Sequence, residues 1–216
     1  MIELLDGLYA GKANPDNSGG GSANKKKYGV TIDAMLGNLS SDAILQLPNV
    51  HDDVVLKGVV KIASQALMNK FYNTGVQSFS APDLTRIDTA SACENAFYNA
   101  SVSSISLPKL KVIGGGRSMY RMFYGCPLTT VEFPEVTTVG GGYCCQGMFE
   151  NCVQLTTLSF LKLNNLYGVT TQFTDMLKSC TDVTVHFPAA METEMQDRAD
   201  VQAGFGGTNT TVLFDL

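Results

Sequence analysis

Residues 128–142 read Leu-Thr-Thr-Val-Glu-Phe-Pro-Glu-Val-Thr-Thr-Val-Gly-Gly-Gly, and residues 148–152 read Met-Phe-Glu-Asn-Cys. This unit recurs through about three quarters of the 216-residue chain. Four tracks of residues repeat in phase at intervals of 26 to 28 positions. They are Pro82, Pro108, Pro134, Leu161 and Pro188; Phe71, Phe97, Phe123, Phe149 and Leu177; Phe79, Ile105, Val131, Leu158, Val185 and Val212; and Ala81, Leu107, Phe133, Phe160, Phe187 and Phe214. A fixed period in the twenties predicts a solenoid, because one such unit cannot bury its apolar face alone.

Each unit contains one short segment that has the pattern of a strand. Val131-Glu-Phe133 alternates apolar and polar residues, and Pro134 ends the strand by removing a backbone donor. We therefore expect one ladder of about seven parallel strands. Their predicted ranges are 54–56, 79–81, 105–107, 131–133, 158–160, 185–187 and 212–214.

The other side of each unit is predicted to be helical. Glycine triplets at 114–116 and 140–142 supply a tight change of direction. Met119, Met122 and Phe123 then follow at i, i+3 and i+4, a spacing that gives one helical turn an inward face.

The pattern Leu-x-x-φ-x-φ-Pro-x-φ-x-x-φ-Gly, with φ an apolar residue, is followed by an aromatic residue and a Cys three positions later. It resembles the BspA-like class of bacterial leucine-rich repeats over residues 54–216. The commoner leucine-rich repeat has Asn or Cys where this chain has Leu84, Leu110, Val136 and Leu163. The resemblance implies an α/β repeat fold, with one parallel β-sheet, short helical turns on the other face and a C-terminal capping helix. It also implies a binding or display role without catalytic residues.

The sequence divides into three predicted parts. Residues 1–27 form an arm with a Gly/Ser linker, residues 28–53 form an N-terminal cap, and residues 54–216 form the solenoid with its C-terminal cap. In the first cap, Thr31 begins a short helix that ends near Gly37. The C-terminal cap is an amphipathic helix within 189–203, with Met191, Met195 and Ala199 on one face.

The start of the arm is apolar, and we expect it to anchor the protein to a partner or to a neighbouring copy in a homo-oligomer. The residues that would make this contact are Ile2, Leu4, Leu5, Leu8 and Tyr9. The segment that begins at Tyr28 is similar to openings found ahead of such repeats in proteins that look like phage or prophage products. A virion component or a cell-surface location is therefore favoured.

Composition excludes several classes of function. The net charge of −5 disfavours a nucleic-acid partner, because phosphate binding needs clustered Lys and Arg. The start of the chain lacks the pattern of a secretory signal, and no stretch of 18 apolar residues predicts a membrane span. The glycine triplets do not match a nucleotide-binding fingerprint, and no cofactor is expected.

The residues best suited to chemistry have structural explanations. Cys126, Cys152 and Cys180 recur at one inward position, so we expect buried, reduced thiols rather than a metal site. The two histidines, His51 and His186, have no nucleophile beside them in a recognised catalytic pattern. No metal site is predicted.

Outward positions of the predicted strands are rich in hydroxyls, and they suggest a ligand-binding face. The candidate residues are Thr130, Glu132, Thr157, Ser159, Thr184 and His186. One interpretation is that Ser and Thr only keep an exposed sheet soluble and favour the strand. The other is a polar face that recognises a host-surface protein or a glycan.

Two classes of function remain open. The first is a non-catalytic interaction or display module of a phage particle, with a bacterial cell-surface adhesin as the alternative. The second is a glycan-acting hydrolase, which requires at least two converging carboxylates or a converging Cys and His.

Overall fold

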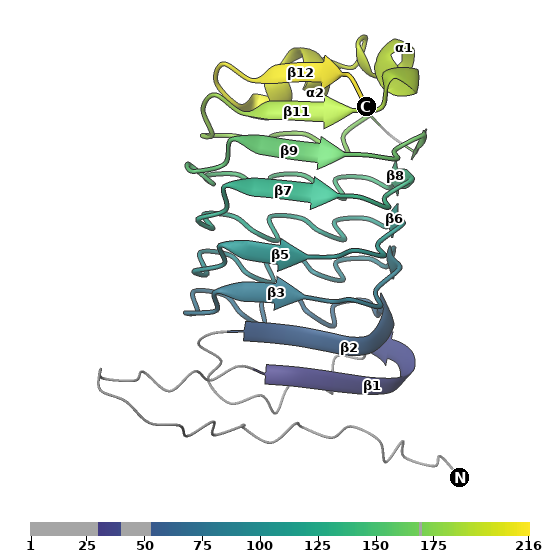
Figure 1. Ribbon diagram of the computed structural model, residues 1–216, viewed down its shortest axis with the longest axis vertical. Coiled ribbons are helices and arrows are strands. Elements are labelled where there is room, and N and C mark those ends of the chain that lie inside the picture. Colours follow the sequence, from purple (N-terminus) through teal and green to yellow (C-terminus); the bar gives the residue numbers. More distant parts are fainter. Residues whose placement is uncertain (1–29, 40–52, 169) are drawn as a thin grey trace.

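The computed structural model describes residues 30–39, 53–168 and 170–216, with side chains from residue 53 onward. The chain winds into a solenoid whose turns stack in sequence order (Figure 1). Strand β1 (Val30–Leu39) lies at one end of the stack, and β12 (Thr211–Phe214) lies at the other with the short helices (Figure 1). The expected leucine-rich-repeat solenoid is confirmed.

One side of the solenoid carries the predicted ladder of parallel strands. Its members after β1 are β2 (Asp53–Ile62), β3 (Ser78–Ser80), β5 (Ser104–Ser106), β7 (Thr130–Phe133), β9 (Thr157–Phe160), β11 (Thr184–Phe187) and β12. Each pair of hydrogen-bonded neighbours is parallel, and the inward residues follow the predicted tracks.

The ladder is not continuous, and in this respect the prediction is wrong. Strand β5 ends an eight-stranded sheet, and β7 begins a separate four-stranded sheet in the order β7-β9-β11-β12. Figure 1 shows a wider gap between β5 and β7 than between the other neighbouring strands of this side.

A second parallel ladder, which the sequence analysis did not predict, lies around the corner from the first. It consists of β4 (Arg86–Ile87), β6 (Val112–Ile113), β8 (Thr138–Gly140) and β10 (Asn165–Tyr167). The long strand β2 pairs with both β3 and β4, and so it joins the two ladders into one sheet. Segments of two or three residues are too short for their alternation to predict a strand.

The third side of each turn is a run of overlapping β-turns, so the predicted helical turn is wrong. Within one turn of the solenoid, the Ala96 amide donates to the Cys93 carbonyl at 3.1 Å. The Cys93 and Phe97 amides instead donate to the next turn, to the carbonyls of Ser118 (2.7 Å) and Met122 (2.8 Å). Half of the amides therefore connect neighbouring turns, which a helix would not allow.

These β-turns place every fourth residue in the left-handed region of φ. The positions recur in columns along the solenoid, and Asn and Gly are frequent in them because their left-handed conformations cost least. One column is Asn69, Asn95, Arg121, Gly147 and Asp175, and another is Asn73, Asn99, Gly125, Asn151 and Ser179.

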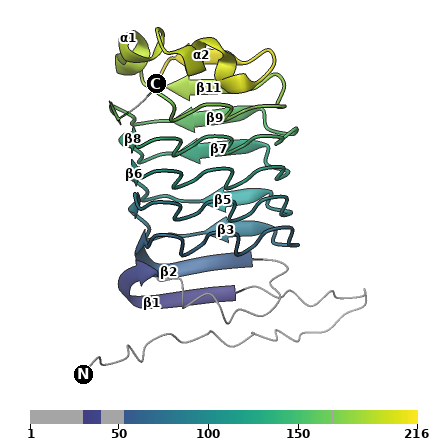
Figure 2. The same ribbon diagram turned by 180° about the vertical axis from the view of Figure 1, so that it is seen from behind.

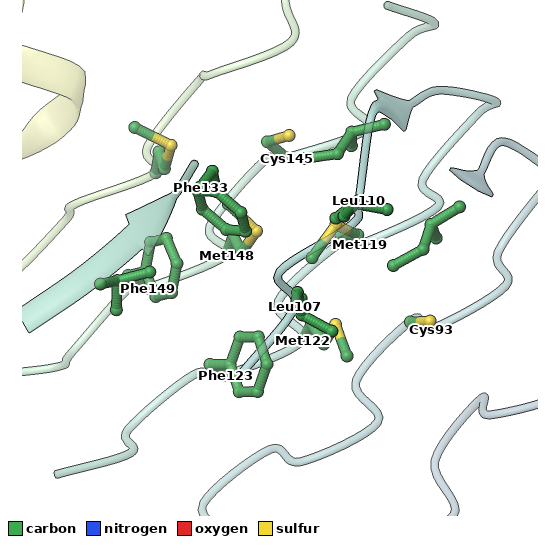
Figure 3. Packing of buried hydrophobic residues seen from close by; sticks show 14 of the residues in the cluster. Cys93, Leu107, Leu110, Met119, Met122, Phe123, Phe133, Cys145, Met148 and Phe149 are labelled. Atoms are coloured by element: carbon green, nitrogen blue, oxygen red, sulfur yellow. The ribbon is translucent and has the colours of Figure 1, made fainter. Parts of the chain in front are cut away.

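The core consists of rows of like side chains that run along the axis. Phe71, Phe97, Phe123 and Phe149 stack face to face, with successive ring centroids 5.0, 5.6 and 5.9 Å apart. Figure 3 shows Phe123 and Phe149 in this row, with Met122 and Met148 beside them. Regular stacking follows directly from the repeat, because equivalent residues in successive turns face one another.

The glycine triplets do more than turn the chain. A side chain at Gly114 or Gly140 would overlap the ring or the hydroxyl of Tyr167, which lies across both positions. Gly141 has a φ of 85°, and a Cβ there would lie 2.8 Å from the backbone of Gly115. The turns approach one another so closely at this corner that only glycine fits.

Both predicted caps differ from the structure. Residues 30–39 form strand β1, which pairs with β2, so the predicted helix from Thr31 to near Gly37 is wrong and the ladder begins before β2. The C-terminal capping helix is present within the predicted range, but it is not one continuous helix. It is broken into η1 (Ala189–Met191), α1 (Glu192–Met195), α2 (Ala199–Gln202) and η2 (Gly204–Gly206).

The helix breaks because its second half turns to bury a different residue. Met191 and Met195 are buried as predicted, but Ala199 is exposed and Asp200 is buried instead. Asp200 accepts hydrogen bonds from Arg198 and from the Phe173 amide of the preceding turn. Figure 2 shows α1 and α2 at the end of the solenoid, beside β11.

Candidate binding face

The structure places the six candidate face residues together on three neighbouring strands. Cross-strand register aligns Thr130, Thr157 and Thr184 in one row, which Thr211 of β12 continues. A second row contains Glu132, Ser159 and His186, and Leu213 of β12 continues it. We call the six candidate residues Thr130, Glu132, Thr157, Ser159, Thr184 and His186 the hydroxyl strip.

The members of the strip differ in exposure. Thr130 and Glu132 are exposed, and Thr157, Thr184 and His186 are half-buried. Ser159 is only 5% exposed, although the alternation of the strand places it on the outer face. Its short side chain lies between the longer Glu132 and His186 in the same row, which leaves it little contact with solvent.

His186 has a partner that the sequence analysis missed. Its Nδ1 lies 2.9 Å from Oδ1 and 3.1 Å from Oδ2 of Asp215, which follows the last strand. The carboxylate fixes the orientation of the ring and leaves Nε2 as the other polar atom of the side chain. This pair could have been predicted from the repeat. Asp215 directly follows Phe214, the last residue of the fourth track, and Leu213 of the same strand is aligned with His186.

The arrangement is that of a polar surface. Among the described residues, no hydrogen bond joins Ser159 to His186, although the two occupy opposite places on β9 and β11. In the same part of the chain, no group of three or more His, Cys, Asp or Glu side chains is placed to hold a metal ion. The strip therefore offers four hydroxyls, one imidazole and one carboxylate, with Asp215 beside the imidazole.

The cysteines lie in the core, away from the strip. The thiols of Cys126, Cys152 and Cys180 donate to carbonyls of the preceding turn at 3.2, 3.0 and 3.2 Å, and all six cysteines of the chain are free. Burial raises the pKa of the Cys126 thiol to about 12 and that of Cys180 to about 11. At neutral pH these groups are protonated and are poor nucleophiles.

A second row of side chains faces outward from the β-turns. Tyr72, Tyr98 and Tyr124 stack with ring centroids 4.7 and 4.1 Å apart, and the Arg121 guanidinium lies 5.8 Å from the centre of the Tyr124 ring. Arg121 also donates to Glu150 at 3.0 Å. Since the rings cover one another's faces, mainly their edges remain for contact with another molecule.

Several predicted features lie outside the described residues. They include His51 and the arm residues Ile2, Leu4, Leu5, Leu8 and Tyr9. Within the described residues, no helix has the length and apolar character needed to cross a membrane.

These features define a parallel-strand solenoid built from leucine-rich repeats, a class that generally provides non-enzymatic binding scaffolds. The chain belongs to the BspA-type leucine-rich repeat family, because the family described as "BspA type Leucine rich repeat region" matches residues 66–194 in six copies. No curated protein matches the chain. The resemblance inferred from the sequence is confirmed at the level of the family.

Proposed function

We propose that the protein is a non-catalytic recognition module whose hydroxyl strip binds a protein or a glycan on a host surface. The observation that supports this most is the register of the strip. Two rows of polar side chains repeat on successive strands of one sheet, at about 4.8 Å per strand. Hydroxyls at a regular spacing can donate and accept hydrogen bonds along a ligand that is itself repetitive or extended.

The charge of the strip sets its expected salt dependence. Glu132 and the His186–Asp215 pair are its charged or titratable groups, and the rest are hydroxyls. Because salt screens charges but does not weaken neutral hydrogen bonds, binding should change little between low and physiological salt.

The test is a fourfold alanine variant of Thr130, Glu132, Thr157 and His186. Its binding to a glycan array and to host-cell surface protein would be compared with that of the unmodified chain. We expect the variant to lose binding and to keep its circular dichroism spectrum. The control replaces Gln154 and Asn164, which are exposed residues outside the strip, and should bind normally. Retained binding by the fourfold variant would contradict the proposal and direct attention to the tyrosine row.

We further propose that residues 1–27 anchor the module to an assembly, such as a phage particle, through the apolar residues Ile2 to Tyr9. The composition of the arm supports this proposal, since an apolar start followed by a Gly/Ser linker suits a tethered contact. Deleting residues 1–27 should leave the solenoid folded and abolish its incorporation into the particle. Normal incorporation of the deletion variant would instead favour a free adhesin or another anchoring surface.

A further inference from the structure

Two strand edges face each other inside this solenoid. Strand β5 pairs with β3 but not with β7, and β7 pairs with β9 but not with β5, although they belong to successive turns. We call the interval between β5 and β7 the seam (Figure 1). Unpaired strand edges are normally covered or protected by charge, because they are templates for pairing with another chain.

The seam is confined to one side of the solenoid. Across the same two turns, β6 pairs with β8, and the β-turn amides of Met119 and Phe123 donate to the carbonyls of Cys144 and Met148 in the next turn. The two turns are therefore held together at their other sides and are separated only where β5 and β7 lie.

The inward side chain of β5 and the outward side chains of both β5 and β7 are more exposed than their equivalents in β3, β9 and β11. Ile105 of β5 is half-buried, whereas its equivalents Phe79, Val131 and Leu158 are 1%, 1% and 0% exposed. It is a core position in the middle of the solenoid that retains contact with solvent. The polar neighbours on the two edges, Ser104, Ser106, Thr130 and Glu132, are all exposed.

Ion pairs also stop at the seam. Lys109 bonds to Asp83 at 2.8 Å, and Glu135 bonds to Lys162 at 2.5 Å, so each charge pairs with the turn on its own side. Within the described residues, no ion pair joins Lys109 to Glu135 across the seam, although the two occupy equivalent places in successive turns.

The approach to the seam also lacks one bond that joins the preceding turns. In the turn before the seam, the Ser101 amide donates to the Thr74 carbonyl at 3.2 Å and helps to draw β5 towards β3. Pro127 stands 26 residues after Ser101 and has no amide hydrogen to donate. The approach to β7 therefore lacks the bond that its counterpart makes.

The backbone groups that face the seam have a defined pattern. The Ser106 carbonyl accepts from Ala81 on the β3 side, so by the alternation of a strand the N–H and C=O of Ile105 face the seam. The Phe133 carbonyl accepts from the Leu161 amide on the β9 side, so the backbone N–H and C=O groups of Thr130 and Glu132 face the seam from β7. The facing edges of β5 and β7 therefore present backbone donors and acceptors at the spacing of an extended chain.

We propose that the seam is a docking site for an extended peptide segment of a partner protein, which enters parallel to β5 and β7. The segment would have the pattern polar, apolar, polar, because every other strand of this ladder has it. Its central side chain would pack on Ile105. Its backbone would form hydrogen bonds with Ile105 of β5 on one side and with Thr130 and Glu132 of β7 on the other. A peptide is favoured over other ligands because only a peptide backbone repeats donors and acceptors with this period.

For a peptide strand to fit between them, β5 and β7 must lie apart by about twice the usual 4.8 Å spacing of neighbouring strands. Peptide binding competes with direct pairing of β5 and β7, in which Ile105 would lie opposite Val131 in the regular register. The partner segment would supply the backbone bonds that the two edges lack. This proposal goes beyond the proposed function of the strip, because it depends on the backbone and not on the strip's side chains.

The first test measures hydrogen exchange of the full chain without a partner. The amides of Ile105, Thr130 and Glu132 should exchange at least about tenfold faster than those of Leu158 and Val185, which lie within paired strands. Equal protection of the two groups would mean that the seam is closed in solution, and this would overturn the proposal.

The second test uses a labelled peptide with the sequence of residues 156–162, Thr-Thr-Leu-Ser-Phe-Leu-Lys, which has the required polar, apolar, polar pattern and in the fold pairs with the opposite edge of β7. Binding, followed by fluorescence anisotropy, should protect the Ile105, Thr130 and Glu132 amides. A control peptide with Leu158→Pro lacks the central donor and should bind about fivefold more weakly or worse.

Three further results decide between occupants. Protection that appears on β12 rather than at the seam would show addition to the end of the ladder and would overturn the proposal. Faster exchange of the seam amides after deletion of residues 1–27 would identify the chain's own arm as the occupant and would also overturn it. A variant with Thr157→Ala, Thr184→Ala and His186→Ala should still bind the peptide even if it loses the ligand of the strip.

Discussion

The buried carboxylate of Asp200 should hold the C-terminal cap onto the solenoid. Its Oδ1 accepts from Arg198 Nε at 3.1 Å and from the Val201 amide at 3.0 Å, and its Oδ2 accepts from Arg198 Nη2 at 2.8 Å and the Phe173 amide at 3.3 Å. The side chains of Arg198 and Asp200 are 9% and 4% exposed. Since Phe173 belongs to the preceding turn, one side chain connects the cap to the repeat below it.

The structure sets the size of the effect of Asp200→Ala. This change leaves the charged Arg198 buried without its carboxylate, and it leaves two backbone amides without their acceptor. Removing one partner of a buried ion pair typically costs about 3–5 kcal/mol. We therefore expect the free energy of unfolding to fall by about 4 kcal/mol. The double variant with Arg198→Leu removes the stranded charge as well and should recover at least half of that loss.

Urea unfolding, followed by circular dichroism, measures this effect, and hydrogen exchange locates it. In a repeat protein the cap can unfold before the rest, so the loss should appear first as exchange in residues 189–216. Asp197→Ala changes an exposed carboxylate of the same segment and should cost less than about 0.5 kcal/mol. A loss below about 1 kcal/mol for Asp200→Ala would refute the reasoning, because it would mean that the pair is solvated or that its bonds are replaced.

Three further predictions follow from the packing. Gly140→Ala should displace the Tyr167 ring and destabilise the protein by about 1–3 kcal/mol, and Tyr167→Ala in the same chain should recover most of this loss. Gly141→Ala should have no such rescue, because its Cβ would meet backbone; urea unfolding of the four variants checks both statements. Stability should fall as the pH rises above about 9, since unfolded thiols ionise there while burial raises the folded pKa to about 11 for Cys180 and about 12 for Cys126. Replacing both cysteines with Ala should reduce that pH dependence only in part, because burial also raises the pKa of the Cys93 and Cys152 thiols, and an unchanged slope would contradict the assignment. Finally, thiol titration in denaturant without reductant should return six free thiols per chain, and a lower number would show a disulfide.

The inward positions of the solenoid could be predicted because each is fixed by the period alone. Phe97, Phe123, Leu158 and Val185 are buried where the tracks place them. A side chain that recurs in phase must meet its own equivalents in the neighbouring turns, whatever the backbone between them does. The prediction of the core therefore did not depend on the secondary structure of each segment.

The secondary structure of the third side could not be predicted from apolar spacing. Met119, Met122 and Phe123 are buried, as a helical turn would require, but overlapping β-turns with a four-residue repeat bury the same positions. The distinguishing feature is the outward column of Asn and Gly, which suits left-handed φ and has no place in a helix. Reading that column would have indicated turns rather than a helix.

The hydroxyl strip was predictable in position but not in detail. Alternation along the strands placed Thr157 and His186 on the outer face, and the register aligns Thr157 with Thr184 and His186 with Ser159. The burial of Ser159 depends on the lengths of its two neighbours, and the contact of His186 with Asp215 depends on where the chain leaves β12. Such features arise between turns and cannot be deduced from the pattern of a single strand.

Period and sheet continuity are separate properties of this solenoid. The interval from Ile105 to Val131 is 26 residues, the same as from Phe79 to Ile105, yet β5 pairs with β3 and not with β7. The interval from Val131 to Leu158 is 27 residues, and the sheet is intact there. An inserted residue therefore does not interrupt the ladder, because the loop absorbs it. The interruption falls instead where the interval of the repeat is constant, so the spacing of the tracks alone does not predict which strands pair.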